Sequence, residues 1–135
     1  DAFSNTEATT TISNVDTYVD LNVSLSQGLA DGYTASGNLV TNSNTPQTTL
    51  LSKVTVSMTL SAGNNNVVTS ILSNNSVDVV ASTQSVTAPA SGDDFVLTMT
   101  CITNLAYNQS LKVRVKNSVA TNVVCKHVNF VVHSI

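Results

Sequence analysis

The sequence predicts an all-β domain, an antiparallel two-sheet sandwich of about eight to ten strands. Three observations lead to this prediction. In several segments apolar and polar residues alternate one for one, which is the period of a strand with one face in a core. No segment of any length shows a helical period. Gly, Asn and Ser clusters separate the alternating segments at the spacing typical of sandwiches.

The composition fits one packed domain with few charges. The chain has 135 residues, of which 41% are hydrophobic and 10% are charged, against roughly 25% charged residues in an average soluble domain. Disorder usually combines low hydrophobicity with high net charge, and neither holds here. No apolar run approaches the roughly 20 residues that cross a bilayer, so membrane insertion is not expected. The N-terminus lacks a basic and apolar signal, so Asp1 is expected to begin a mature chain or an excised domain.

The first half of the chain contains two clear alternating segments. Residues 1–14 are polar and are expected to be a lead-in strand or a linker from an upstream stalk. Residues 18–26 alternate as a strand, residues 27–49 suggest turns around short strands, and residues 50–61 alternate again. The last segment should point Val54, Val56, Met58 and Leu60 into the core.

The second half predicts a hairpin followed by three consecutive strands. Residues 67–72 and 77–82 flank an Asn-rich turn, and residues 83–94 are expected to be a surface loop. Strands at residues 95–105, 111–117 and 122–135 are expected to form an antiparallel meander. Alternation in the middle strand turns three cations to one face: Lys112, Arg114 and Lys116.

Charge is separated along the chain. Residues 1–52 carry five acids and no Lys or Arg, a charge of -5, whereas residues 111–135 carry four bases and no acid, a charge of +4. The two ends are therefore expected to attract each other, either within one fold or across a subunit boundary.

From Ser52 onward the order of strands and turns resembles the jelly-roll domain of the C1q and tumour-necrosis-factor superfamily, including the C-terminal heads of viral and phage fibres. The matching pieces are the strand to Leu60, the hairpin Ile71–Val80, the strand ending in Leu105, the alternating strand and the last strand. The family often has Leu-x-x-Gly-Asp before the alternating strand; here Leu105–Gln109 keeps the Leu and loses the Gly-Asp. The resemblance covers about the last two thirds of the chain. It implies a single jelly-roll head over residues 15–135 that assembles as a homotrimer, with ligand contacts on outer loops or between subunits.

Catalysis, metals and cofactors are not expected. No Gly-x-Ser-x-Gly elbow or phosphate loop is present, and Asp93 and Asp94 fit a solvated turn better than an acid and base pair. His127 and His133 are six residues apart, roughly 20 Å along a strand, which is too far to share a metal. Cys101 and Cys125 are not expected to form a disulfide, because alternation predicts that they point to opposite faces.

The basic stripe is weak evidence for nucleic-acid binding. An acidic chain without Trp lacks the stacking platforms and the broad positive field that such binding uses. A solvated face or pairing with acids of a neighbouring subunit is the simpler interpretation, and a sialylated or sulfated glycan is the functional one. Asn-x-Ser sequons occur at Asn22, Asn74 and Asn108, and Asn74 at a hairpin tip is expected to be the most accessible.

Three functions are compatible with these features. The first is an oligomeric fibre or spike head on a virion surface that attaches to a host-cell protein or glycan. The second is a structural capsid protrusion or decoration domain without its own receptor, and the third is a secreted ligand of the C1q or tumour-necrosis-factor type. Trimer and pentamer are both open. Candidate contact residues for a receptor or glycan are Tyr33, Asn65, Asn74, Asn75, Asp93, Asp94, Tyr107, Lys112, Arg114 and Lys116. Candidate subunit-interface residues are Val123, Cys125, His127, Val131 and Ile135.

Overall fold

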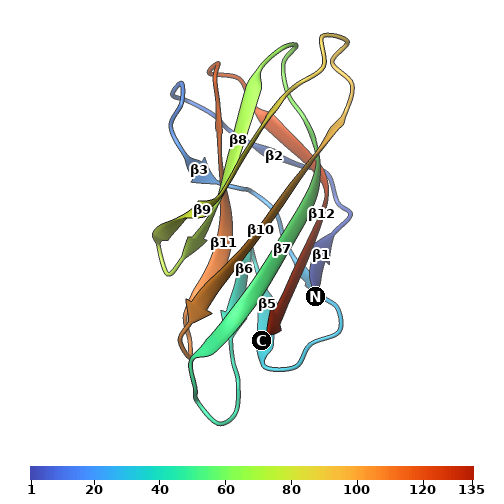
Figure 1. The fold of residues 1–135 in the computed structure, drawn as a ribbon. Coiled ribbons are helices and arrows are strands. Elements are labelled where there is room, and N and C mark those ends of the chain that lie inside the picture. The colour runs from blue at the N-terminus through green and yellow to red at the C-terminus, as the bar shows by residue number, and fades with distance from the viewer.

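The structure is a computed structural model that describes residues 1–135, and it consists of strands and loops (Figure 1). No helix in it could cross a membrane. The twelve strands are β1 (Ala2–Ser4), β2 (Ala8–Thr10), β3 (Val19–Asp20), β4 (Ser26–Gln27), β5 (Tyr33–Ser36), β6 (Leu39–Asn42), β7 (Leu50–Ser61), β8 (Val67–Asn74), β9 (Val77–Thr87), β10 (Phe95–Leu105), β11 (Ser110–Asn117) and β12 (Val123–Ser134).

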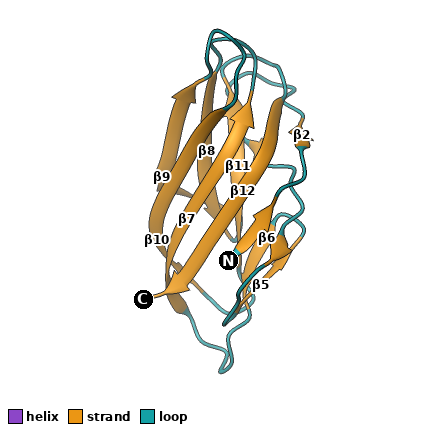
Figure 2. Cartoon of the chain, turned by 90° about the vertical axis from the view of Figure 1, so that its right-hand side faces the viewer, coloured by secondary structure: helices purple, strands orange, loops and turns teal.

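The strands form two antiparallel sheets of six strands each. Sheet A has the order β10-β7-β12-β1-β4 with β2 also beside β12, and sheet B has the order β5-β6-β11-β8-β9 with β3 also beside β11. Figure 2 shows β10, β7 and β12 side by side in one layer, with β8 and β11 behind them. The chain passes from one sheet to the other between β7 and β8, β9 and β10, β10 and β11, and β11 and β12. This is jelly-roll connectivity, which confirms the predicted fold class.

The predicted number of about eight to ten strands matches the number of longer strands in the structure. Eight strands, β5 to β12, have four or more residues, and the other four have two or three. The predicted meander of the last three strands is wrong, because β10 and β12 lie in sheet A on either side of β7, whereas β11 lies in sheet B beside β8. Alternation specifies which face of a strand is buried, but it does not specify the neighbouring strand.

The core lies between the two sheets and is built from the alternating residues. All four apolar residues predicted to face inward from β7 are buried, and so are Leu111, Val113 and Val115 of β11. Tight burial of branched and unbranched apolar side chains supplies most of the stability of such a domain. The largest fully buried side chains include Phe130, Leu21, Met58, Leu60, Leu72, Leu97, Met99, Leu105 and Leu111.

The N-terminal residues are part of the sandwich. β1 and β2 both pair with β12, and Ala2 and Ile12 are buried in the core. The long strand predicted at residues 18–26 is wrong: only β3 and β4 are strands, and they belong to different sheets. The segment between them crosses from sheet B to sheet A, so its alternating Leu21 and Leu25 enter the core without a continuous ladder.

The β8–β9 hairpin is confirmed, but its second strand is longer than predicted. Asn75 and Ser76 form the turn with φ angles of 49° and 68°, a left-handed conformation that Asn tolerates better than most residues. β9 continues to Thr87, so the predicted loop over residues 83–94 is reduced to residues 88–94. Sparse large apolar residues in residues 83–87 left this edge strand without a clear signal in the sequence.

A bulge in β12 corrects the expected direction of the Cys125 thiol. The register against β7 shifts between Cys125 and His127, so Cys125 faces the core together with Val128 and Phe130, whereas His127 is exposed. Cys101 also faces the core, and both cysteines are free thiols. They pair with Val54 and Leu60, six residues apart on β7 and so about 20 Å apart, which prevents a disulfide. The expected free thiols are confirmed, for a different reason.

The same bulge removes two of the expected interface residues. Val123 and Cys125 are buried inside a single chain, so neither can contact another subunit. The other three candidates, His127, Val131 and Ile135, lie on the outer side of sheet A.

Candidate functional site

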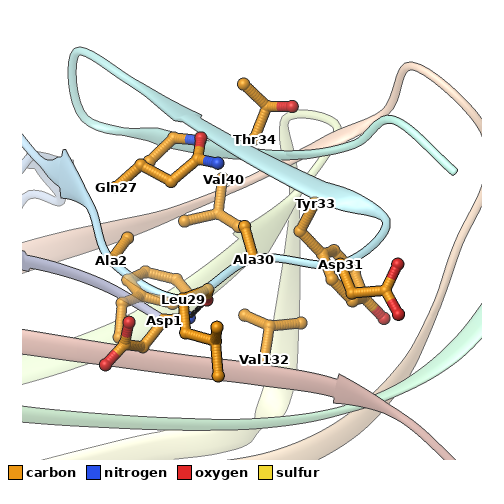
Figure 3. A pocket seen from close by; sticks show the side chains of 12 residues that line it. Asp1, Ala2, Gln27, Leu29, Ala30, Asp31, Tyr33, Thr34, Val40 and Val132 are labelled. Atoms are coloured by element: carbon orange, nitrogen blue, oxygen red, sulfur yellow. Dashed lines mark hydrogen bonds between the residues drawn. The ribbon is translucent and has the colours of Figure 1, made fainter.

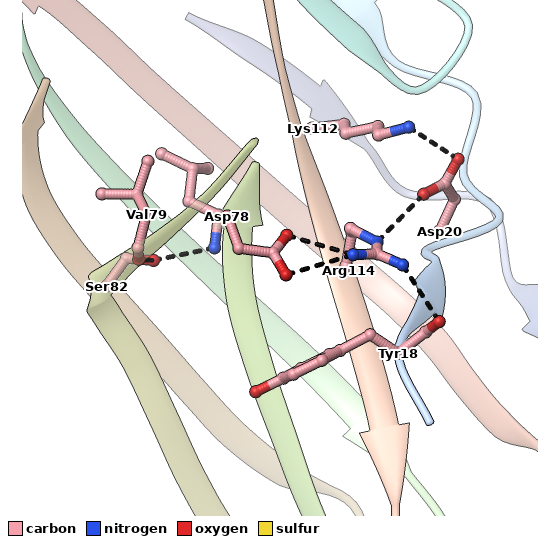
Figure 4. A network of polar contacts seen from close by, with 8 residues as sticks. Tyr18, Asp20, Asp78, Val79, Ser82, Lys112 and Arg114 are labelled. Carbon is pink, nitrogen blue, oxygen red and sulfur yellow. Dashed lines mark hydrogen bonds and ion pairs between the residues drawn. The ribbon is translucent and has the colours of Figure 1, made fainter. Parts of the chain in front are cut away.

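The outer side of sheet B carries the basic stripe, and its cations are paired within the chain (Figure 4). The guanidinium of Arg114 donates to both carboxylate oxygens of Asp78 at 3.1 and 3.2 Å and to the carbonyl of Tyr18 at 3.1 Å. Its Nε lies 3.5 Å from the Asp20 carboxylate, and the Nζ of Lys112 lies 2.9 Å from the same group. These contacts connect β11 to two segments far from it in the sequence, the one with Tyr18 and Asp20 and the one with Asp78.

This network settles how the separated charges meet. Asp20 from the acidic first third pairs with Lys112 and Arg114 from the basic last third, so the attraction acts within one chain. Lys116 lies over the ring of Tyr18 at 5.0 Å. Partial burial, followed by the charge of Asp78, raises the pKa of the Tyr18 hydroxyl. A stripe whose Lys112 and Arg114 are already neutralised is a poor site for a sialylated or sulfated glycan.

A second group of candidates lies at the end of the sandwich away from the two chain termini (Figure 1). Here the β7–β8, β9–β10 and β11–β12 loops meet, and the Asn66 side chain donates to Thr121 at 2.8 Å. Asn65, Asp93 and Asp94 are exposed on this end. Asp94 pairs with Lys126 at 2.9 Å, and this contact raises the pKa of the Lys126 ammonium. The end offers amides, hydroxyls and carboxylates without an aromatic anchor.

Tyr33 is not an exposed anchor as expected. Its side chain is 9% exposed, and its hydroxyl makes a buried hydrogen bond of 2.8 Å with Ser52. Tyr33 lines a small apolar pocket between the ends of the two sheets, with Ala2, Val40 and Val132 among its walls (Figure 3). The enclosed volume of about 30 Å³ holds roughly two water molecules. The pocket is too small for a drug-sized ligand.

A polar cleft of about 260 Å³ lies where the β8–β9 turn meets the end of β10 and the β10–β11 turn. Asn74 and Asn75, two predicted contact residues, line it. The Nδ2 of Asn74 donates to Thr103 at 3.0 Å and to the carbonyl of Asn104 at 2.6 Å, so Asn74 is held against β10 and is not the free tip that was expected. Thr103, Asp78 and Gln109 also line the cleft. The sequence analysis missed these three, because only the folded chain brings the segments together.

The other predicted contact residue and the other sequons are more open. Tyr107 is half-buried in the β10–β11 turn, and Asn108 of the same turn is exposed with a φ of 65°. Asn22 is also exposed, but its side chain donates to the carbonyl of Thr9 at 3.0 Å. Of the three sequon side chains, only that of Asn108 makes no hydrogen bond within the chain.

The outer side of sheet A, called the A face below, differs from the rest of the surface. Cross-strand hydroxyl pairs cover its middle, Ser57 with Thr98 at 3.1 Å and Thr55 with Thr100 at 3.4 Å. Lys53 is the one Lys or Arg on its β7, β10 and β12 rows between Leu51 and Thr59, and it makes no ion pair. Six of the twelve large apolar side chains that the chain exposes lie here: Phe3, Leu51, Val96, Ile102, Val131 and Ile135.

Both histidines lie on the A face. The Nδ1 of His127 is 3.2 Å from the Oδ1 of Asn5, and His133 lies opposite Lys53 in the β7–β12 ladder. No group of three or more His, Cys, Asp or Glu side chains is close enough to hold a metal ion.

Comparisons with known proteins identify the fold. No family model and no curated protein matches the chain. Among solved structures, the vertex protein P5 of PRD1 superposes with a TM-score of 0.57 at 12% identity, covering 99% of this chain and 96% of P5. Murine APRIL at pH 5.0 superposes with a TM-score of 0.54 at 11% identity, covering 93% of this chain and 99% of APRIL. Murine APRIL at pH 8.5 has a TM-score of 0.55 at 10% identity, covering 92% and 94%.

The fold is a jelly roll of the C1q and tumour-necrosis-factor type. The resemblance drawn from the spacing of the last two thirds therefore extends over nearly the whole chain. At these identities the likeness concerns the fold alone. One of the two proteins is a phage vertex protein, and APRIL shares the same arrangement of strands.

Proposed function

We propose that this chain is the oligomeric head domain of a fibre or spike on a virion surface, and that it attaches the particle to a protein or glycan of the host cell. The observation that carries the proposal is the A face: a broad sheet surface with half of the exposed large apolar side chains and a single unpaired Lys. The likeness of the fold to a PRD1 vertex protein supports the virion assignment. The proposal includes an upstream stalk and no catalytic activity.

A second copy of the chain is the partner proposed for the A face. Large exposed apolar patches on soluble domains usually mark contact surfaces. On the B side, by contrast, Lys112 and Arg114 already have carboxylate partners within the chain. Three copies around an axis are the arrangement implied by the family resemblance. Three of the predicted interface residues lie on the A face: His127, Val131 and Ile135.

Attachment is assigned to the surfaces that the A face leaves free. These are the loop end with Asn65, Asp93 and Asp94 and the cleft with Asn74 and Asn75. Both are built from turns held by hydrogen bonds to neighbouring turns or strands, so a ligand would meet ordered groups. Rigid presentation lowers the entropic cost of binding.

Light scattering in solution is the first test. A trimer supports the proposal, a pentamer changes the symmetry, and a stable monomer contradicts it. Binding of the fluorescently labelled oligomer to host cells then tests attachment.

Two alternatives give different results in these assays. A purely structural protrusion or decoration domain would form the same oligomer and bind no host cell. A secreted ligand, which the fold of APRIL makes the second candidate, would bind receptor-bearing cells without any association with a particle. Co-purification of the chain with virions separates the secreted ligand from the other two functions.

A further inference from the structure

We infer that the cleft between the β8–β9 turn and the β10–β11 turn binds a single neutral sugar unit. The inference rests on the proposed attachment function and names the ligand class for one of its surfaces. The volume of about 260 Å³ lies just below the roughly 300 Å³ at which drug-sized pockets begin. A ligand of one ring therefore suits it better than a folded partner.

The cleft presents unpaired donors and acceptors on one side. The Asn75 side chain makes no hydrogen bond within the chain, and Gln109 uses only its Oε1, which accepts from the Ala106 N–H at 3.1 Å. The Oδ1 of Asn74 is buried without a partner. This oxygen has no accessible surface, so the amides that remain open to a ligand are those of Asn75 and Gln109. Sugars carry hydroxyls that both donate and accept.

Apolar residues also line the cleft. Val77 is 70% exposed and pairs with Asn74 across the hairpin, and Val79 lies two residues further along β9. Sugar rings have an apolar side of C–H groups beside their hydroxyls, and a Val side chain in water gains by covering it. Polar groups beside an exposed apolar residue thus match the mixed polar and apolar surface of a pyranose ring.

The charge of the cleft selects against acidic sugars. Asp78 is the charged residue among those that line it, and Arg114 holds its carboxylate at 3.1 and 3.2 Å. Because Arg114 is occupied by this pair and by Asp20, it is not free to bind the carboxylate of a sialic acid. A neutral hexose is favoured over the anionic glycan that the basic stripe suggested.

The cleft is held in shape before any ligand arrives. The backbone N–H of Asn75 donates to the carbonyl of Ser110 at 2.9 Å, which fixes the β8–β9 turn to the first residue of β11. Asn74 is bonded to Thr103 and Asn104 at the end of β10. The walls of the site come from β8, β9, β10 and the β10–β11 turn, and these bonds set their separation (Figure 1).

The test is an NMR titration of the isotope-labelled protein with methyl α-D-glucopyranoside, methyl β-D-galactopyranoside and the methyl glycoside of N-acetylneuraminic acid. We expect at least one neutral glycoside to shift the side-chain amide signals of Asn75 and Gln109 with a millimolar Kd, and the acidic glycoside to leave them unchanged. No shift with either neutral glycoside, or shifts with the acidic one alone, would overturn the inference.

Two variants with matched controls locate the site. Asn75→Gly removes the amide but keeps the left-handed turn, and we expect it to weaken binding about five-fold or more, the effect of one hydrogen bond. Asp16→Gly removes a side chain from a left-handed residue with a φ of 52° outside the cleft and should have no effect. Val77→Arg should block the cleft, and Val80→Arg on the same strand should not. Equal binding by Asn75→Gly and the unchanged protein would contradict the assignment.

Cell binding separates this inference from the proposed function. If the oligomer binds host cells equally before and after periodate oxidation of their glycans, the attachment function is supported and the sugar-binding inference is contradicted. If the glycosides bind in the cleft but the oligomer binds no host cell, the sugar-binding inference is supported and the attachment function is contradicted. Loss of cell binding in Asn75→Gly but not in Asp16→Gly supports both.

Discussion

The two outer faces of the sandwich differ in the partners that the chain itself supplies to their charged side chains. Both belong to sheets whose inner sides share one core. The B side surrounds Arg114 with Asp20, Asp78 and Tyr18 and so completes its polar contacts within the chain. The A face exposes hydroxyls and apolar side chains and leaves Lys53 without a partner. A face that is complete can remain in water, whereas an incomplete face indicates a further contact.

The largest expected effect is on assembly through the A face. Val131→Asp places a carboxylate at a position that is 36% exposed in the single chain, so the subunit should still fold. Buried without a counter-ion in the oligomer, the charge should cost about 3 to 5 kcal/mol per subunit, and light scattering should show monomers. Val15→Asp, on an exposed residue outside the A face, is the control. An intact Val131→Asp oligomer would remove the proposed difference between the faces.

The next effect is on the stability supplied by the B-side network. Arg114→Met keeps the apolar stem but leaves Asp78 and the Tyr18 carbonyl without their donor. We expect urea unfolding to show a loss of about 2 kcal/mol, the scale of hydrogen bonds to charged groups. Lys116→Met removes only the contact with the Tyr18 ring and should cost at most about 1 kcal/mol. Equal losses in the two variants would contradict the central place of Arg114.

The core between the faces provides a reference that depends on neither of them. Burial raises the pKa of the Cys125 thiol from 9.0 to about 11. The unfolded chain therefore loses its thiol proton at lower pH than the folded chain, and the free energy of unfolding should fall between pH 9 and 11. The slope due to this group is at most about 1.4 kcal/mol per pH unit.

Cys125→Val isolates that contribution. The variant keeps an apolar side chain of similar size and removes the ionisable thiol, so its unfolding free energy should fall less steeply over the same pH range. Other groups that titrate there are common to both proteins and cancel in the difference. Identical pH profiles of the variant and the unchanged protein would show that the thiol is not protected by burial.

The smallest expected effect is the contribution to stability of the ion pair between Lys112 and Asp20. Their side chains are partly exposed and 2.9 Å apart, and such pairs are worth less than about 1 kcal/mol. A double-mutant cycle with Lys112→Met and Asp20→Asn should give a coupling of this size that disappears at high salt. The oligomer should not weaken under the same conditions, because apolar contacts are not screened. Dissociation at high salt would indicate ionic contacts on the A face.

Much of the fold follows from alternation in the sequence. The inward residues of β7, the shared outer face of the three cations on β11 and the β8–β9 hairpin are confirmed. The pairing of strands is not local information, so β10, β11 and β12 were expected side by side and are divided between the sheets. The bulge at Cys125 has no Gly or Pro to mark it, and a single extra residue reversed the predicted direction of Val123 and Cys125.

The candidate site was less predictable than the fold. The separation of acids and bases indicated that they would attract each other. The partners of Arg114, however, are Asp78 and Tyr18, which are 36 and 96 positions away in the sequence, so only the folded chain identifies them. Tyr33 was expected to be a contact residue because aromatic side chains carry much contact energy, yet Ser52 gives its hydroxyl a buried partner. The cleft joins the hairpin of residues 74–79 to Thr103 and Gln109, and no local pattern in the sequence marks the last two.

The position of β12 has a consequence for the biogenesis of the protein. This strand is formed by residues 123–134, yet it lies in the interior of sheet A, where β7 pairs along one side and β1 and β2 along the other. Until those residues have left the ribosome, β2 has no partner in the sheet, β1 has only its short pairing with β4, and one edge of β7 is open. Such open edges invite wrong pairing. The chain is therefore expected to reach its native state only after translation has passed residue 134, with chaperones shielding the incomplete sheet until then.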